Sequence, residues 1–262
     1  MTEVFRHIVI TGASSGIGRA LALAYAEPGV VLGLLGRDGE RLAASAAACR
    51  LQGADVVTGQ VDVCDAEALR TWLEEFDRAH PIDLLVANAG VSSTIAHASD
   101  WEDCERTLRV VETNFHGVIH AALPVIEFMR VRGRGRIAMI ASIAALRGMA
   151  ISPAYCASKA AIKAWADSVR PLLKRDGIAV SVILPGFVKT AMSDVFPGAK
   201  PFRWSAERAA AHIRRGLDGG RSEIAFPALL AFGMRLLVLL PVAVADAILD
   251  RLSYLPQEDA RN

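Results

Sequence analysis

Short apolar runs alternate with longer segments of helical periodicity from one end of the chain to the other. The run at 8–10 is too continuous in its hydrophobicity for a sheet with one wet face, and it predicts a buried parallel strand. Further strands are expected at 30–35, 54–58, 82–87, 136–141, 178–184 and 223–226. Helices are expected at 17–26, 40–51, 66–80, 101 or 103 to 130, 153–175 and 205–216. This alternation predicts an α/β fold, a single doubly wound (Rossmann-type) domain with a mostly parallel seven-stranded sheet and helices on both faces.

Composition narrows the class of protein. The chain has 262 residues, of which 53% are hydrophobic, enough to bury one large core. The formal net charge is +1, so we expect no strongly positive surface that would bind nucleic acid. The four cysteines lie far apart without a C-x-x-C pair, which is typical of reduced thiols. The first seven residues contain no signal-peptide h-region, and we therefore expect a cytoplasmic protein.

A glycine-rich turn follows the first strand directly. Gly12, Gly16 and Gly18 follow the strand at 8–10 directly, and a helix begins near Ile17. Glycine accepts positive φ and has no Cβ, so the turn can bring backbone N–H groups close to a phosphate. The positive end of the helix then points at the same anion. A nucleotide site is expected here, although strand-to-helix loops also contain glycine for backbone reasons alone.

The end of the second strand bears on the choice of cofactor. An acidic side chain at this place grips the ribose 2′-OH of NAD, whereas an arginine accommodates a 2′-phosphate. This chain has Gly36 and Arg37 there, which favours NADP(H) over NAD(H). Two alternatives stay open: Arg37 as a solvated residue at a helix start, and Asp38 as a competitor for the ribose.

A tyrosine and a lysine are spaced for proton chemistry. Tyr155 and Lys159 lie four apart on a predicted helix, so the phenol and the ammonium share one face. We expect the nearby cation to lower the pKa of the phenol toward neutrality. Ser142 follows the strand at 136–141, thirteen residues before the tyrosine. His116 and His120 are also four apart, but no third ligand accompanies them and no metal site is predicted.

Several motifs in order resemble the short-chain dehydrogenase/reductase family. They are T-G-x-x-x-G-x-G at 11–18, N-A-G at 88–90, the serine and Y-x-x-x-K just described, and P-G-x-V-x-T at 185–190. Ala87 departs from the family's usual N-N-A-G. The resemblance implies the catalytic residues Asn114, Ser142, Tyr155 and Lys159. It implies a cofactor site made of Gly12, Ser14, Ser15, Gly16, Ile17, Gly18, Arg37, Asp62, Val63, Asn88, Ala89, Gly90, Tyr155, Lys159, Pro185, Gly186, Val188 and Thr190.

The resemblance also implies an activity. It is reversible hydride transfer between NADP(H) and a small-molecule carbonyl or alcohol, with Tyr155 as general acid/base and Ser142 polarising the carbonyl. Lys159 would hold the nicotinamide ribose, and Asn114 would bind a water that links the lysine to solvent. A homodimer or homotetramer through the helices at 104–130 and 153–175 is implied. The alternative is a dinucleotide-binding regulator without catalytic activity. Such a protein would not need all four of Asn114, Ser142, Tyr155 and Lys159.

The carboxyl-terminal part bears on the substrate. We divide the single domain into a core at 1–190, a substrate loop, helix and last strand at 191–226, and an apolar helical extension at 227–262. The loop at 191–204 predicts a wall for a hydrophobic substrate, with Met149 and 144–146 completing it and Arg147 meeting a polar end. The apolar part of the extension, 227–252, predicts two short helices that break at Pro241. Three locations stay open for them: the domain's own core, a subunit interface, or a membrane surface, where the enzyme would reduce a lipid-like substrate.

Overall fold

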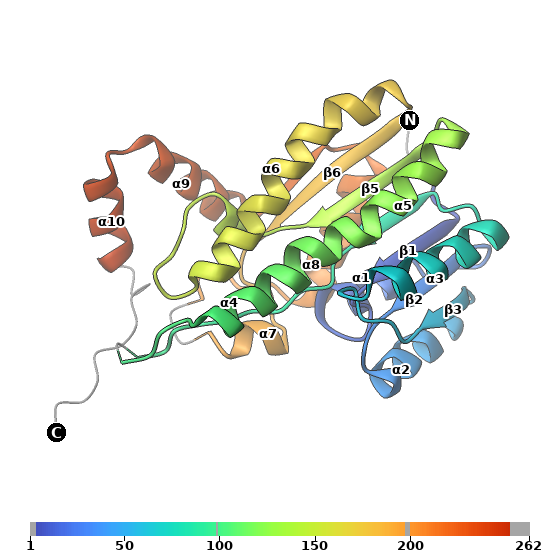
Figure 1. The fold of residues 1–262 in the computed structure, drawn as a ribbon, viewed down its shortest axis with the longest axis horizontal. Coiled ribbons are helices and arrows are strands. Elements are labelled where there is room, and N and C mark those ends of the chain that lie inside the picture. The colour runs from blue at the N-terminus through green and yellow to red at the C-terminus, as the bar shows by residue number, and fades with distance from the viewer. Residues whose placement is uncertain (1–3, 98, 197–199, 252–262) are drawn as a thin grey trace.

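One parallel sheet organises the chain (Figure 1). The computed structural model describes residues 4–97, 99–196 and 200–251. The sheet has the strand order β3-β2-β1-β4-β5-β6-β7, and every neighbouring pair is parallel. The strands are β1 His7–Thr11, β2 Val31–Leu35, β3 Asp55–Gly59, β4 Leu84–Ala87, β5 Gly135–Ile140, β6 Ile178–Pro185 and β7 Glu223–Phe226. The predicted seven-stranded, doubly wound fold is confirmed.

Two layers of helices cover the sheet. The cores on its two faces contain residues from α1, α2 and α8 on one side, and from α3, α5, α6 and α9 on the other. The helices are α1 Gly16–Tyr25, α2 Gly39–Arg50, α3 Ala66–Ala79, α4 Cys104–Val111, α5 Gly117–Arg132, α6 Pro153–Arg175, α7 Ala191–Asp194, α8 Ala206–Asp218, α9 Ala228–Leu239 and α10 Val242–Arg251.

The alternation of side chains along each strand builds both cores. On β1, Ile8 and Ile10 enter the core beneath α1 and α8, whereas Val9 enters the core beneath α3 and α5. Consecutive strand residues point to opposite faces, so a strand covered on both sides must be apolar at every position. This requirement explains why the central strands read as unbroken apolar runs.

The chain reverses its winding between β1 and β4, which are neighbours in the sheet. From β1 the order runs outward to β3 on one side and to β7 on the other. The connections on the two sides therefore leave a crevice at the carboxyl ends of these central strands. In open α/β sheets this crevice is where ligands bind.

The helix expected from residue 101 or 103 to 130 is interrupted at Asn114, where the family resemblance also implies a distortion of the helix. Asp103 caps α4, and a π-helical turn over Glu112–His116 separates α4 from α5. Asn114 lies in this turn, fully buried, and both ends of its amide hydrogen-bond the backbone of Val91. These bonds hold the extra residue of the π turn, a feature that helices use mostly at functional sites.

The described part of the apolar extension, up to residue 251, forms the two predicted helices, with Leu240 and Pro241 between them. The predicted extension from 252 to 262 lies outside the described residues. Ala231, Met234 and Leu237 of α9 are buried in the core beside α6. Figure 1 shows α9 and α10 beyond one end of the sheet. Within the described residues, no helix is both long enough and apolar enough to cross a membrane.

Candidate active site

The glycine turn after β1 depends on close backbone contacts. Gly12 and Gly16 have φ of +67° and +55°, the left-handed region that favours glycine. A Cβ at Gly18 would lie 2.3 Å from the carbonyl oxygen of Gly12, so only glycine fits there. Asn88 at the end of β4 donates to the carbonyl oxygens of Thr11 and Gly12, at 3.0 and 3.2 Å. The turn is thereby fixed against the neighbouring strand.

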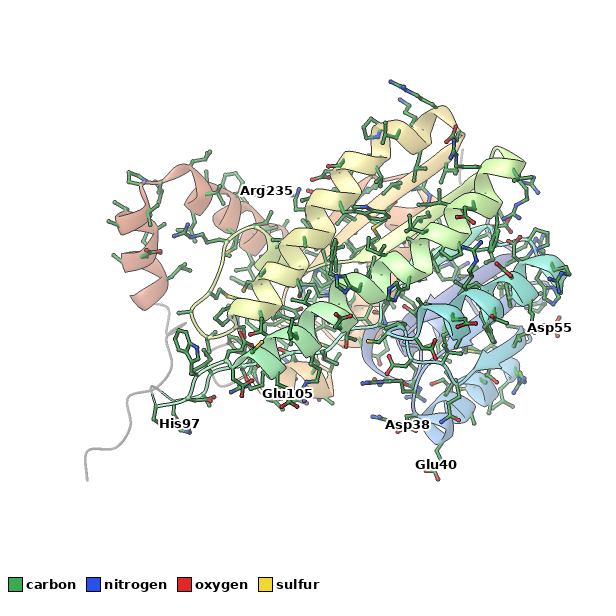
Figure 2. All side chains as sticks on the ribbon, in the orientation of Figure 1. Asp38, Glu40, Asp55, His97, Glu105 and Arg235 are labelled. Carbon is green, nitrogen blue, oxygen red and sulfur yellow. The ribbon has the colours of Figure 1, made fainter. Side chains whose placement is uncertain are left out.

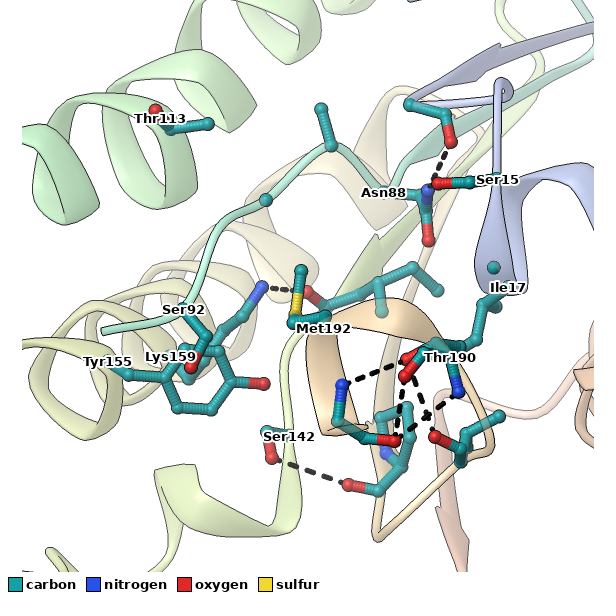
Figure 3. A pocket seen from close by; sticks show the side chains of 18 of the residues that line it. Ser15, Ile17, Asn88, Ser92, Thr113, Ser142, Tyr155, Lys159, Thr190 and Met192 are labelled. Atoms are coloured by element: carbon teal, nitrogen blue, oxygen red, sulfur yellow. Dashed lines mark hydrogen bonds between the residues drawn. The ribbon is translucent and has the colours of Figure 1, made fainter. Parts of the chain in front are cut away.

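A cavity of about 620 Å³ extends from this turn across the carboxyl ends of the strands. Every predicted cofactor residue lines it except Gly18, which lies behind the turn. Ser142, Tyr155 and Lys159 line it as well, but Asn114 does not. Figure 3 shows Ser15 and Ile17 at one side of the cavity and Tyr155 at another. Among the predicted site residues, the structure thus brings together positions up to 178 apart, from Gly12 to Thr190.

Ser142, Tyr155 and Lys159 meet beside the end of β5. The Ser142 hydroxyl donates to the carbonyl oxygen of Pro185 at 3.4 Å, and the phenol of Tyr155 lines the same cavity (Figure 3). The Ser142 hydroxyl also accepts from the backbone N–H of Ala144 at 3.1 Å, which fixes its position. Lys159 is 4% exposed, and its ammonium donates to the carbonyl oxygen of Ile140 at 2.9 Å (Figure 3). Two hydroxyls and one buried cation therefore face the same space.

The expected lowering of the phenol's pKa is wrong in direction. Burial raises the pKa of Tyr155 to about 12, and the nearby Ser142 hydroxyl counteracts this only in part. Burial also lowers the pKa of Lys159 from 10.5 to about 8. The ammonium lies 5.8 Å from the centre of the tyrosine ring and is directed at Ile140. Desolvation thus outweighs the helical proximity on which the sequence argument depended.

Asn114 is connected to the site from behind the cavity wall. Its amide nitrogen donates to the Ser158 hydroxyl at 3.0 Å, and that hydroxyl donates to the carbonyl oxygen of Tyr155 at 2.8 Å. A Cβ at Gly90 would lie 3.1 Å from Asn114 Oδ1 and 3.5 Å from Lys159 Nζ. The asparagine therefore connects the loop after β4 to the helix that carries the tyrosine. Its role in holding a water stays a prediction.

The far end of the cavity is polar. Arg37 lies 3.4 Å from the Asp62 carboxylate and is largely exposed. Asp38 caps α2 and pairs with Arg41, Nε to Oδ2, at 2.6 Å, and its hydrogen bonds with Arg41 hold its pKa below the usual range (Figure 2). Arg41 also lines the cavity, and the sequence reasoning missed it. Its position four residues after Arg37, in the first turn of a helix, was the available signal.

The opposite end is apolar, and only part of the predicted wall forms it. Ala144, Met149, Met192 and Phe196 line the cavity as expected, and Phe187, Leu230 and Met234 join them. The other predicted wall residues do not line it: 145 and 146, Val195, Phe202 and Trp204. Trp204 stacks on Phe226 in the core, with ring centres 4.8 Å apart. Arg147, expected to meet a polar end of the substrate, pairs with Asp246 at 2.5 Å instead.

The two histidines on α5 and its preceding turn have separate partners. His116 Nδ1 lies 3.0 Å from Glu112, and His120 Nδ1 lies 3.0 Å from the carbonyl oxygen of Val63. No group of three metal-ligating side chains occurs among the residues that the structure describes. All four cysteines are free thiols, and two of them, Cys49 and Cys156, are buried.

A glycine turn at the switch point of a parallel sheet, with a serine, a tyrosine and a lysine across the same cavity, defines the site of a nucleotide-dependent oxidoreductase. The sequence profile described as short chain dehydrogenase matches residues 6–198. The chain therefore belongs to the short-chain dehydrogenase/reductase family, whose members are oxidoreductases that use NAD(P)(H).

Three known proteins illustrate the relationship. An uncharacterized oxidoreductase of Myxococcus xanthus is 35% identical over 250 residues, which cover 95% of this chain and 98% of that one. A short chain dehydrogenase/reductase from Burkholderia phymatum in complex with NAD has a TM-score of 0.80 at 25% identity, covering 98% of both chains. An alcohol dehydrogenase of Thermococcus sibiricus complexed with 5-hydroxy-NADP has a TM-score of 0.74 at 26% identity, covering 84% of this chain and 95% of that one. Both nucleotides thus occur among its structural relatives.

Proposed function

We propose that this protein interconverts a carbonyl and an alcohol on an apolar small molecule, with NADP(H) as cofactor and Tyr155 as general acid/base. One observation carries the proposal. Ser142, Tyr155 and the buried Lys159 line one cavity whose one end is a glycine turn and whose other end is apolar. Such an arrangement combines a nucleotide site, two donors for a carbonyl oxygen and a wall for a hydrophobic substrate.

The residues at the glycine turn fit a dinucleotide. A Cβ at Gly12 would lie 2.8 Å from the Cα of Ala89, so only glycine lets the turn approach the loop after β4 this closely, and Gly12 itself lines the cavity. Ser15 begins α1 without a side-chain hydrogen bond to its first turn, which leaves backbone N–H groups there for a phosphate. The loop from Pro185 to Thr190 lines the same cavity next to the turn, where a Cβ at Gly16 would lie 3.2 Å from Thr190 Cγ2.

The bound nicotinamide would supply or accept the hydride. Ser142 and Tyr155 donate hydrogen bonds to the carbonyl oxygen and polarise it. A phenol with a pKa of about 12 is protonated at neutral pH, so Tyr155 holds the proton that the new alkoxide needs. The phenolate that remains is stabilised by the Lys159 ammonium behind it. Lys159, with a pKa of about 8, is the nearest group that can return a proton.

Replacing Tyr155 by Phe tests this role. The substitution removes one hydroxyl and keeps the ring, so we expect the affinity for NADPH to stay within about twofold and turnover to fall about 10²-fold to 10⁴-fold. Cofactor affinity is measured by fluorescence titration, and turnover by NADPH oxidation across a panel of apolar ketones. Tyr25→Phe, which removes a buried hydroxyl bonded to Asp218 far from the cavity, is the matched control. Retention of most activity in Tyr155→Phe would contradict the proposal.

The preference for NADP(H) is supported by charge at the end of β2. Gly36 offers no carboxylate there, Arg37 and Arg41 both line the cavity, and Asp38 is engaged as a helix cap. A charge-assisted hydrogen bond to phosphate contributes about 1.5–3 kcal/mol. We therefore expect Arg37→Ala to weaken NADPH binding at least about tenfold and to leave NADH binding within about twofold. Equal losses for both nucleotides would refute the preference, and Arg78→Ala on the exposed side of α3 is the control.

Exposed apolar side chains bear on the oligomeric state, and the free cysteines bear on the cellular location. We infer a homodimer or homotetramer through α4, α5 and α6, where Leu108, Leu123 and Leu172 are about half exposed. Large apolar side chains on helix faces of this kind are typical of subunit interfaces. The four free cysteines support a reducing, cytoplasmic setting. Light scattering of the purified protein, with Leu172→Glu as the test variant, measures the assembly directly.

A further inference from the structure

Large apolar side chains form an exposed surface on the last two described helices, α9 and α10. Its side chains are large, aliphatic or aromatic, and each is at least 37% exposed. We call it the apolar ridge. It consists of Leu229, Phe232, Leu236, Val238, Leu239, Leu240, Val242, Val244 and Ile248. Water-exposed apolar surface of this extent marks a place where a protein meets another molecule.

The two charges on these helices are paired with the rest of the domain, and their side chains are about half exposed. Between residues 228 and 249 only Arg235 and Asp246 are charged. Arg235, labelled in Figure 2, pairs with Glu223 of β7, and Asp246 pairs with Arg147 of the loop after β5. Every other exposed side chain in that stretch is apolar. The ridge therefore presents hydrocarbon with no hydrogen-bonding side chain among it.

The opposite face of α9 belongs to the active-site cavity. Leu230 and Met234 line the cavity, while Leu229, Phe232 and Leu236 of the same helix lie on the ridge. The ridge and the substrate wall are thus separated by the thickness of one helix. Whatever covers the ridge lies next to the apolar end of the cavity.

We propose that the apolar ridge lies in the surface of a lipid bilayer, at the boundary between headgroups and acyl chains. Apolar substrate would reach the cavity from this layer, passing beside α9. The passage of substrate rests on the proposed function. The membrane contact does not, because it follows from the exposed side chains alone.

The chemistry of the ridge favours lipid over a second copy of the chain. Protein interfaces carry about one hydrogen bond per 100–200 Å². The ridge residues offer no hydrogen-bonding side chain, and the two charges beside them are already paired with the domain. Acyl chains require no polar partner, and a helix with one face in the protein and one apolar face outward lies in the plane of the interface. Since no cluster of basic side chains accompanies the ridge among the residues described, we expect binding without a need for anionic lipid.

Flotation with phosphatidylcholine vesicles tests the contact. We expect the wild-type chain to rise with uncharged vesicles, to the same extent at low and high salt. Burying a Leu or Phe side chain is worth about 1.5–3 kcal/mol, so Phe232→Glu and Leu239→Glu should each weaken binding about tenfold or more. Val131→Glu replaces a side chain that is 90% exposed at the end of α5, outside the ridge, and should float like the wild type.

Three results would overturn the proposal. They are wild-type protein that stays below the vesicles at every lipid concentration, an equal loss in Val131→Glu, and ridge variants that turn a dimer into a monomer without changing flotation. The last would make a second copy the occupant. Reduction of a water-soluble ketone, measured without vesicles, should be the same in the wild type and both ridge variants. Flotation without any such activity would refute the proposed function and leave the membrane contact standing.

Discussion

The buried ammonium of Lys159 should lower the free energy of unfolding of the protein. The side chain is 4% exposed, and its ammonium donates to the Ile140 carbonyl oxygen at 2.9 Å. Burial lowers the pKa of this group from 10.5 to about 8. A lowered lysine pKa means that the fold disfavours the charged form. We therefore expect Lys159→Met, which keeps the length of the side chain without its charge, to raise the free energy of unfolding at neutral pH.

The size of the effect follows from the pKa. The difference between 10.5 and about 8 corresponds to about 3 kcal/mol. Loss of the hydrogen bond to Ile140 offsets about 1 kcal/mol, leaving a net gain of about 2 kcal/mol at pH 7. Between pH 8 and 10.5 the unfolded chain binds more protons at this site than the folded chain, so wild-type stability rises with pH there. The advantage of the variant is therefore complete below pH 8 and lost by pH 10.5.

Urea denaturation of both proteins at pH 7 and pH 10 measures this difference. Comparing the two chains at each pH cancels the titration of all other groups. Lys163→Met is the matched control, one turn further along α6, where the ammonium is partly exposed and lies 2.6 Å from Asp167. That change should lower stability by at most about 1 kcal/mol. A Lys159→Met variant that is less stable at pH 7, or that differs equally from wild type at both pH values, would refute the reasoning.

Three further changes probe the scaffold of the site. Glu102 is 8% exposed and accepts a backbone N–H in the first turn of α6 at 2.7 Å, so Glu102→Ala should lower the free energy of unfolding by about 1 kcal/mol and Glu102→Gln by less, as measured by thermal denaturation. Gly18→Ala would place a Cβ 2.3 Å from the Gly12 carbonyl oxygen, and it should weaken cofactor binding at least about tenfold in a fluorescence titration. Arg132 makes two bonds to Asp77, at 2.6 and 2.9 Å, so Arg132→Ala should lower stability by about 3 kcal/mol in urea.

The fold was predictable because its central strands are covered on both faces. Ile8, Val9 and Ile10 must all be apolar when one face packs on α1 and the other on α3 and α5, and this produces a local pattern. The π turn at Asn114 was not predictable in the same way. Its amide bonds the backbone of Val91, 23 residues earlier, and such a long-range partner leaves no periodicity in the surrounding sequence.

The candidate site likewise has features that the local sequence predicts and features that depend on distant residues. Tyr155 and Lys159 are one helical turn apart, so their proximity was visible in the sequence. The direction of the pKa shift of Tyr155 was not, because it depends on burial by residues from distant elements. Leu230 and Met234 belong to a helix more than 200 positions after the glycine turn, and only the folded chain shows that they line the cavity. Trp204 was expected there by its place in an apolar loop, yet it packs on Phe226.

Burial acts on the tyrosine and the lysine in a way that favours proton transfer. It raises the pKa of Tyr155 and lowers the pKa of Lys159, so the resting pair at neutral pH is a neutral phenol beside an uncompensated buried cation. When negative charge develops on the substrate oxygen or on the phenol, under the proposed function, the cation gains a counter-charge in a poorly solvated space. The buried ammonium thus lowers the stability of the resting protein and stabilises the negative charge of the transition state. This interaction accelerates the reaction because it is stronger in the transition state than in the ground state.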